Sequence, residues 1–187
     1  MCSVRIRDSE ASQEKILDAA EKLFVEKGYN ATSLRQVAAD AAVAKSLIFH
    51  HFQTKAELWE QVKARRMRDF AQRQQEAFEQ GGVNLERLTD AIREYFLLLK
   101  NDPSLVRLMV RTELEDEPCQ ERFDLALAQQ FIQRLEKAQA QGLMREQLPP
   151  CHVLALILSA VNHWFEARRK FEQWPGIRDA EQADQAY

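Results

Sequence analysis

Apolar residues recur along most of the chain with the 3.6-residue spacing of an amphipathic α-helix. Glycine and proline each occur only five times in 187 residues, and runs rich in valine, threonine and tyrosine are few. Alanine, leucine, glutamate, glutamine, lysine and arginine, which favour helices, are abundant. The sequence therefore predicts an all-α protein.

Capping residues and breakers divide this pattern into separate helices. Residues 1–10 are interpreted as a mobile arm, in which Arg5 and Arg7 could reach a DNA groove. Thr32 is the expected N-cap of the second helix and Thr54 that of the fourth. The expected helices span about residues 12–27, 34–41, 45–52, 55–80, 84–100, 103–117, 120–141 and 151–174.

The second and third of these helices are short and are joined by a tight turn. In the second helix, Leu34 and Val37 belong to one apolar stripe. In the third, Ile48 and Phe52 lie one turn apart and would fix one side to a core. The opposite side then carries polar and exposed residues, namely Lys45, Ser46, Phe49 and His50. This layout is typical of a helix-turn-helix whose second helix enters the major groove of DNA.

The segment from Ile16 to Trp59 resembles the DNA-binding domain of the tetracycline-repressor (TetR) family of bacterial transcription regulators. The resemblance rests on several elements in order: Phe24, Gly28-Tyr29, Thr32, Val37-Ala38, His51-Phe52 and Lys55. It implies a three-helix helix-turn-helix head, residues 1–54, joined by a long helix to a helical bundle body, residues 55–187. The body would bind an effector and form a homodimer.

Three positions depart from the family pattern. Ala42 replaces the turn glycine, Ala44 replaces the serine that caps the recognition helix, and Phe49 replaces a tyrosine. Alanine tolerates a left-handed turn poorly, and Ala44 has no oxygen with which to cap a helix. These departures therefore affect the geometry of the turn and the stability of the third helix.

The resemblance and the direction of each side chain together predict the DNA contacts. Lys45, Ser46 and Leu47 would reach base edges, whereas helix N-termini and positive charges would hold phosphates. The full expected set is Thr32, Ser33, Arg35, Lys45, Ser46, Leu47, Phe49, His50 and Lys55. The expected partner is a double-stranded, palindromic operator.

Charge and motif content restrict the other functional classes. The net charge of −3 argues against indiscriminate coating of nucleic acid, so DNA binding must be local. No phosphate-binding glycine loop, nucleophile elbow or metal-ligand spacing occurs, so we expect no enzyme activity, no cofactor and no metal. The three cysteines fit a reducing cytosol, and no apolar run approaches the ~20 residues of a membrane span. A cytoplasmic protein without a membrane partner is the expectation.

The body is expected to contain an elongated, mostly apolar pocket for an uncharged or weakly charged small molecule. Tyr95 and Asn162 are polar groups in otherwise apolar stripes, which is how such pockets orient a ligand. The full expected set is Met67, Phe70, Tyr95, Phe96, Leu99, Met109 and Asn162. Taken singly, each of these residues is more often ordinary core.

Helix 151–174 is apolar on nearly every side in its first half, which requires a second copy of the chain to cover it. The expected dimer interface uses helices 120–141 and 151–174, through either Phe131 and Leu135 or Val153, Ile157 and Trp164. The functional prediction is a repressor released from its operator by a small hydrophobic effector. The alternative is a ligand-independent dimer with the same head that organises DNA or recruits proteins.

Overall fold

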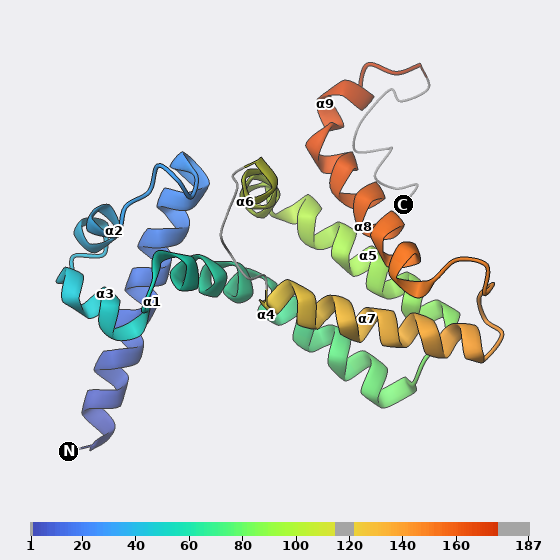
Figure 1. The fold of residues 1–187 in the computed structure, drawn as a ribbon, viewed down its shortest axis with the longest axis horizontal. Coiled ribbons are helices and arrows are strands. Elements are labelled where there is room, and N and C mark those ends of the chain that lie inside the picture. Colours follow the sequence, from blue (N-terminus) through green and yellow to red (C-terminus); the bar gives the residue numbers. More distant parts are fainter. Residues whose placement is uncertain (1, 115–121, 176–187) are drawn as a thin grey trace. The chain divides into compact units, whose positions relative to one another are not determined.

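The computed structural model describes residues 2–114 and 122–175, and all regular elements within these ranges are helices (Figure 1). This confirms the all-α prediction. The chain forms two compact units: Met1–Met67 with Arg107–Phe123, and Arg68–Val106 with Asp124–Tyr187. The predicted end of the sixth helix near Pro118 lies outside the described residues.

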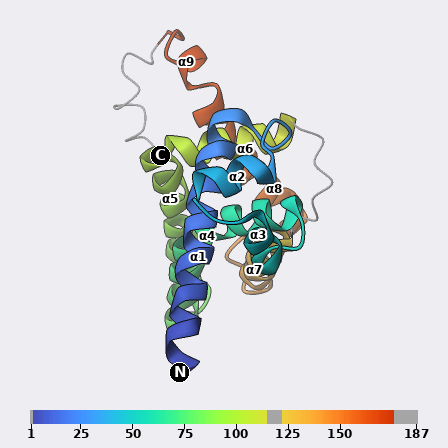
Figure 2. The ribbon, with the colours of Figure 1, turned by 90° about the vertical axis from the view of Figure 1, so that its left-hand side faces the viewer.

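The first unit is built on α1 (Cys2–Lys27), α2 (Leu34–Asp40) and α3 (Lys45–His51), which contact one another (Figure 2). Its core contains buried apolar side chains from each of these helices, including Ile16, Phe24, Val37 and Ile48. The first turns of α4 (Lys55–Gly81) also belong to this unit. The three-helix head that the family resemblance implies is therefore confirmed.

Aromatic packing and ion pairs attach the start of α4 to α1. The ring of Trp59 is fully buried and meets the ring of Phe24 edge-on at 4.6 Å between centroids. One turn and a half further along α4, Arg65 forms ion pairs with Asp18 at 2.7 Å and Glu21 at 2.5 Å. Burial lowers the pKa of Arg65, but hydrogen bonds to these carboxylates outweigh that effect and raise it. The beginning of α4 is thus an integral part of the first unit.

Two predictions about helix starts concern α1 and α2, and both are wrong. Helix α1 begins at Cys2 rather than near Ser12, so residues 2–10 are helical and do not form an arm. No glycine or proline precedes Gly28, and extending an existing helix costs far less than nucleating one. The N-cap of α2 is Ser33, not Thr32, because the Thr32 hydroxyl donates to the Gly28 carbonyl at 2.7 Å.

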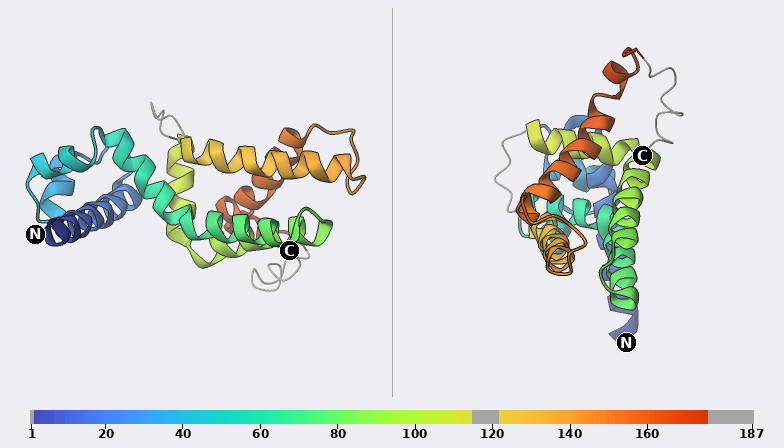
Figure 3. Two further views of the ribbon diagram at one scale, coloured as in Figure 1. Left: turned by 90° about the horizontal axis from the view of Figure 1, so that it is seen from below. Right: turned by 90° about the vertical axis from the view of Figure 1, so that its right-hand side faces the viewer.

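The second unit contains the later part of α4 together with α5 (Leu85–Asn101), α7 (Arg122–Ala140) and α8 (Pro150–Glu166). In Figure 3, left, α7 runs alongside the second half of α4. Side chains from all four helices form the core, namely Phe78, Leu88, Ala91, Leu135, Ala138 and Leu154. Helix α6 (Pro103–Leu114) begins at a proline, as predicted, and spans the boundary between the two units.

The connection from α4 to α5 is specified by three residues. Gly82 has a φ of 65°, which favours glycine, and Asn84 caps α5 by accepting from the Arg87 amide at 2.8 Å. The Arg87 side chain turns back and donates to the carbonyl of Ala77 near the end of α4. The turn therefore satisfies polar groups at both helix ends.

Helix α8 ends at Glu166, earlier than the predicted residue 174, and a short helix α9 (Arg168–Phe171) follows. Ala167 departs from helical geometry with a φ of −102° and a ψ of 11°. The change of direction allows the Phe171 ring to stack on the Trp164 ring, with centroids 5.5 Å apart. Aromatic packing rather than a glycine or proline breaker accounts for the early end of α8.

Candidate nucleic-acid interface and ligand pocket

Helix α2 begins with a reciprocal cap that fixes its first turn. The Ser33 side chain accepts from the Gln36 amide at 3.3 Å, and the Gln36 side chain accepts from the Ser33 amide at 2.9 Å. Ser33 and Arg35 are exposed on this turn. The N-terminus of α2 therefore offers an ordered, solvent-facing position for a phosphate group.

A lysine on α1 neutralises the acidic charge near α2 and α3. Asp40, the one acid in the stretch from Ala31 to Lys55, forms an ion pair with Lys22 at 3.3 Å. The same stretch contains the cations Arg35 and Lys45 but no acid other than Asp40. The local charge of this surface therefore favours an anionic partner, although the whole chain is acidic.

The turn between α2 and α3 adopts the geometry that usually requires glycine. Ala42 has a φ of 53°, in the left-handed region, while the Val43 amide donates to the Ala38 carbonyl at 3.0 Å. An alanine in this conformation costs roughly 1–2 kcal/mol because its Cβ approaches the backbone. The turn geometry is therefore kept despite the substitution, at the expense of local strain.

Helix α3 has the two faces that the apolar pattern predicts. Ile48 and Phe52 are completely or almost completely buried, with 0% and 1% of their surfaces exposed. Lys45, Ser46, Phe49 and His50 are exposed, and Leu47 is half-buried. The core contacts thus fix the orientation of α3 and leave an adjoining set of side chains accessible to a partner.

The N-terminus of α3 has no side-chain cap. Ala44 occupies the N-cap position with an extended backbone, a φ of −69° and a ψ of 140°, and makes no side-chain bond to the helix. The Lys45 ammonium instead lies 5.5 Å from the centre of the Phe49 ring. Phe49 therefore supports the position of Lys45, although it lacks the hydroxyl of the family's tyrosine.

Two of the predicted contact residues are less accessible than their neighbours. The Thr32 side chain is only 2% exposed and its hydroxyl bonds to backbone carbonyls of the first unit. It therefore does not belong with the exposed side chains, because its polar group stabilises the connection between α1 and α2. Lys55 is half-buried, with its ammonium 4.1 Å from the centre of the Tyr29 ring.

The adjacent histidines of α3 point to different surroundings, as expected for neighbours on a helix. His50 is exposed, whereas His51 is half-buried. Burial lowers the pKa of His51, and the nearby His50 lowers it further. His50 is therefore the more accessible histidine of the two.

The expected ligand residues are divided between the two units. Met67 and Met109 fall in the first unit, while the remaining five, Phe70, Tyr95, Phe96, Leu99 and Asn162, fall in the second. Within the second unit the Tyr95 hydroxyl donates to Asn162 Oδ1 at 2.6 Å, and the Phe70 ring lies 5.7 Å from that of Tyr95. These residues form a packed aromatic and polar group between α4, α5 and α8.

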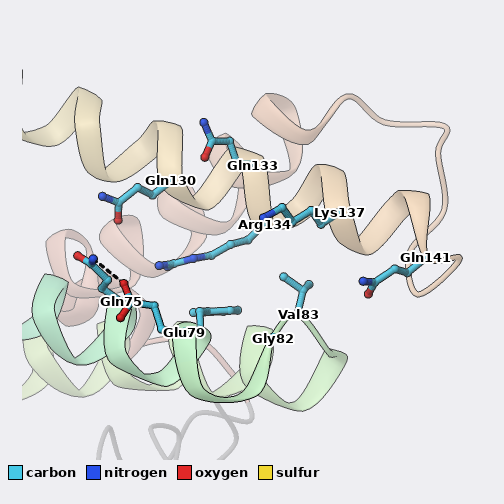
Figure 4. A pocket seen from close by; sticks show the side chains of 10 residues that line it. Gln75, Glu79, Gly82, Val83, Gln130, Gln133, Arg134, Lys137 and Gln141 are labelled. Carbon is cyan, nitrogen blue, oxygen red and sulfur yellow. Dashed lines mark hydrogen bonds between the residues drawn. The ribbon is translucent and has the colours of Figure 1, made fainter.

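A pocket of about 570 Å³ lies in the second unit between α4 and α7 (Figure 4). Arg134 extends from α7 toward α4, where Gln75 donates a 2.8 Å hydrogen bond to Glu79. The lining consists of Gln75, Phe78, Glu79, Gly82, Val83, Gln130, Gln133, Arg134, Lys137 and Gln141. None of the seven expected ligand residues contributes to it.

Sequence reasoning missed this pocket because most of its walls are polar residues on exposed helix faces. One signal was available: Arg134 interrupts the apolar stripe that contains Phe131, Leu135 and Ala138. A charged residue adjoining a core stripe is worth explaining, because an unpaired buried charge is costly. That signal identifies the central residue of the pocket but not its walls.

Across residues 2–114 and 122–175, no three His, Cys, Asp or Glu side chains converge as metal ligands. Over the same ranges, none of the helices has the length and apolar character needed to cross a membrane.

Comparison with known proteins matches two family models to separate parts of the chain. Residues 16–62 match the family described as "Bacterial regulatory proteins, tetR family". Residues 85–186 match "Tetracyclin repressor-like, C-terminal domain". The first match includes α2 and α3, and the second covers more than half of the chain. The protein belongs to the TetR family of bacterial transcription regulators.

Similar proteins include regulators of different kinds. The HTH-type transcriptional activator FasR of Mycolicibacterium smegmatis is 30% identical over 112 residues, which are 60% of this chain and 50% of FasR. NalD, the secondary repressor of the MexAB-OprM multidrug efflux pump in Pseudomonas aeruginosa, has a TM-score of 0.69 and 27% identity, covering 93% of each chain. This chain thus spans about half the length of the curated relatives that it matches.

The fold is also that of FadR from Bacillus subtilis, whose structure was solved in complex with stearoyl-CoA. The TM-score is 0.68 at 19% identity, and the alignment covers 92% of this chain and 95% of FadR.

Proposed function

We propose that this protein is a sequence-specific DNA-binding regulator that inserts α3 into the major groove of a palindromic operator. The observation that carries the proposal is the orientation of α3. Ile48 and Phe52 hold it to the core, while Lys45 and His50 are exposed on its free face. A helix held in this way can place the same side chains against the bases at every binding event.

The proposed contacts divide into base readers and phosphate binders. Lys45, Ser46 and Leu47, at the start of α3, would reach base edges, with Leu47 against a thymine methyl group. Ser33 and Arg35 at the start of α2, His50 on α3 and Lys55 at the start of α4 would hold phosphates. Phe49 would support Lys45 through the cation–π contact, and Thr32 would contribute through its backbone alone.

The division between readers and phosphate binders can be tested on an operator selected from genomic fragments. Lys55→Ala should weaken binding to operator and random DNA alike and reduce the slope of log affinity against log salt by about 1. Lys45→Ala and Leu47→Ala should in addition reduce the preference for operator over random DNA. Lys170→Ala, a change of an exposed lysine on α9, is the control and should alter neither quantity. Equal losses on operator and random DNA from Lys45→Ala and Leu47→Ala, as from Lys55→Ala, would reject the assignment of base readers.

We further propose that the regulator is a repressor whose body binds a small effector. NalD, a repressor, and FadR, solved with stearoyl-CoA, support a ligand-responsive body by analogy. Helix α4 is one continuous element that begins in the first unit and continues into the second. A ligand among the helices of the second unit can therefore act on the reader helices through α4, releasing the operator. Full switching requires the effector to prefer the released form by about 5 kcal/mol.

The homodimer would form through α7 and α8. Leu156 is 61% exposed on α8, and the neighbouring exposed residues Ala155, Ser159 and Ala160 are small and uncharged. An exposed apolar helix face of this kind favours self-association. A two-fold dimer would then carry two copies of α3, which must be ~34 Å or a multiple apart to fit successive major grooves.

One observation favours the ligand-independent alternative. Tyr95 and Asn162, expected to orient an effector, satisfy each other's hydrogen bonding within the body. A panel of small molecules measured for thermal stabilisation and operator release distinguishes the two functions. Release by at least one compound supports the repressor, and no effect from any compound supports the DNA-organising dimer.

A further inference from the structure

Arg134 is a buried cation of the second unit, and its hydrogen-bonding capacity is not fully satisfied by its neighbours. Only 9% of its surface is exposed, and within the described residues its Nη1 atom has no hydrogen-bond partner. Its guanidinium carbon lies 4.0 Å from the centre of the Phe78 ring and 5.2 Å from that of Phe131. These rings stabilise the positive charge but accept no conventional hydrogen bond from Nη1.

Glu79, the acid that acts electrostatically on Arg134, does not complete the site. Glu79 favours the charged form of Arg134 electrostatically, yet burial has the larger effect and lowers the pKa of Arg134. Glu79 Oε1 already accepts a 2.8 Å hydrogen bond from Gln75. A guanidinium remains protonated in proteins at neutral pH, so Arg134 presents a charged donor with an open position.

The Arg134 side chain lines a pocket that has both apolar and polar walls. Arg134 lines the cavity of about 570 Å³ between α4 and α7, and Figure 4 shows its side chain directed toward α4. Phe78 and Val83 supply apolar lining, and four glutamines supply neutral polar lining. The charged lining residues are Arg134, Lys137 and Glu79, so the lining is net positive.

We propose that this pocket binds an amphipathic acid, a carboxylate or phosphate ester, whose anionic group pairs with Arg134 and whose apolar part lies on Phe78 and Val83. A planar guanidinium is suited to both anions because it can donate two parallel hydrogen bonds. Lys137 adds a second positive charge to the lining. The inference rests on the proposed function only in naming this ligand class as the effector. It replaces the uncharged or weakly charged effector expected from the sequence.

Direct binding to the full-length protein tests the site with matched probes. Decanoate, decyl phosphate and decanol share one alkyl chain and differ in the head group. Calorimetry should show at least one of the two anions binding about tenfold or more tightly than decanol. The anion that binds tighter identifies the head group. Equal or weaker binding of both anions relative to decanol overturns the proposal.

Two variants and a control assign the binding to the pocket. Arg134→Met, which keeps the length and removes the charge, should reduce anion affinity about tenfold while leaving decanol binding within a factor of two. Gln133→Trp should fill the cavity and abolish binding of all three probes with Arg134 intact. Arg93→Gln removes an exposed arginine that pairs with Asp90 on α5, and should change nothing. Unchanged anion affinity in both pocket variants overturns the proposal.

The thermal midpoint without ligand separates a binding role from a purely structural one. If Arg134 is kept for a ligand, Arg134→Met should raise the midpoint, since an apolar side chain replaces an incompletely paired buried charge. If its contacts with Phe78 and Phe131 are its whole role, the midpoint should fall and anion binding should persist. The second result overturns the proposal.

Operator binding distinguishes failure of this inference from failure of the proposed function. Anions that bind through Arg134 without weakening operator affinity would leave the site established and reject its role as the effector site. Operator release by other compounds, with no binding of either anion, would keep the repressor function and reject this site.

Discussion

The Tyr95 hydroxyl on α5 donates a 2.6 Å hydrogen bond to Asn162 Oδ1 on α8. Both residues were expected to orient a ligand because each is polar within an apolar stripe. Their pairing joins two helices across the second unit, where Phe96 also contacts Phe165 with ring centroids 4.9 Å apart. A polar residue in an apolar stripe therefore has at least two explanations, and this geometry favours a structural contact.

We expect Tyr95→Phe to lower the free energy of unfolding by about 1–3 kcal/mol, because Asn162 loses its partner in a part-buried site. Chemical denaturation of Tyr95→Phe, Asn162→Leu and the double variant measures the coupling. The double variant should recover part of the loss, since an apolar pair leaves no unsatisfied group. Strictly additive losses, or a loss of ligand affinity without loss of stability, would instead support a ligand-facing pair.

Ala42→Gly should stabilise the protein by about 1 kcal/mol, because glycine adopts the left-handed φ without the steric cost to alanine. Ala39→Gly, an exposed change inside α2, is the matched control and should destabilise by a similar amount. Denaturant unfolding followed by circular dichroism compares the two. A destabilising Ala42→Gly would show that the turn carries no strain.

Ala44→Ser should stabilise α3 by about 1 kcal/mol, since a serine oxygen at the N-cap can accept from an amide of the first turn. Hydrogen exchange of the α3 amides provides the local measurement, and global unfolding gives the total. Ala44→Val has no capping oxygen and should bring no gain. Equal protection of α3 in both variants would contradict a capping effect.

Leu156→Arg should convert the proposed dimer to monomers, because it places a charge on the exposed apolar face of α8. Analytical ultracentrifugation measures the change. Leu143→Arg replaces another exposed leucine, in the segment between α7 and α8, and should leave the dimer intact. A Leu156→Arg dimer of unaltered affinity would exclude this face. Ile157, a candidate from the sequence, is half-buried, so its substitution would also perturb the fold.

The sequence by itself determined the all-helical fold class, most helix boundaries and which face of α3 packs against the core. Ile48 and Phe52 lie one helical turn apart, and that spacing alone places them on one face. Residue type also predicts that Gly28 ends α1 and that Thr54 caps α4, because helix ends are specified by local backbone requirements. Gly28 has a φ of 88° and Thr54 accepts from the Glu57 amide at 3.0 Å, as their residue types suggest.

Only the tertiary structure decided which side chains form hydrogen bonds or cation–π contacts between helices that are distant in sequence. Thr32 could cap α2 by its residue type, but the carbonyls of Leu23 and Gly28 take its hydroxyl. Tyr95 meets Asn162 across 67 positions of sequence, and Arg134 meets Phe78 from another helix. Helical periodicity gives the direction of a side chain from its own axis but not the neighbour it meets. The pocket around Arg134 follows from such encounters, because its walls come from separate helices brought together by packing.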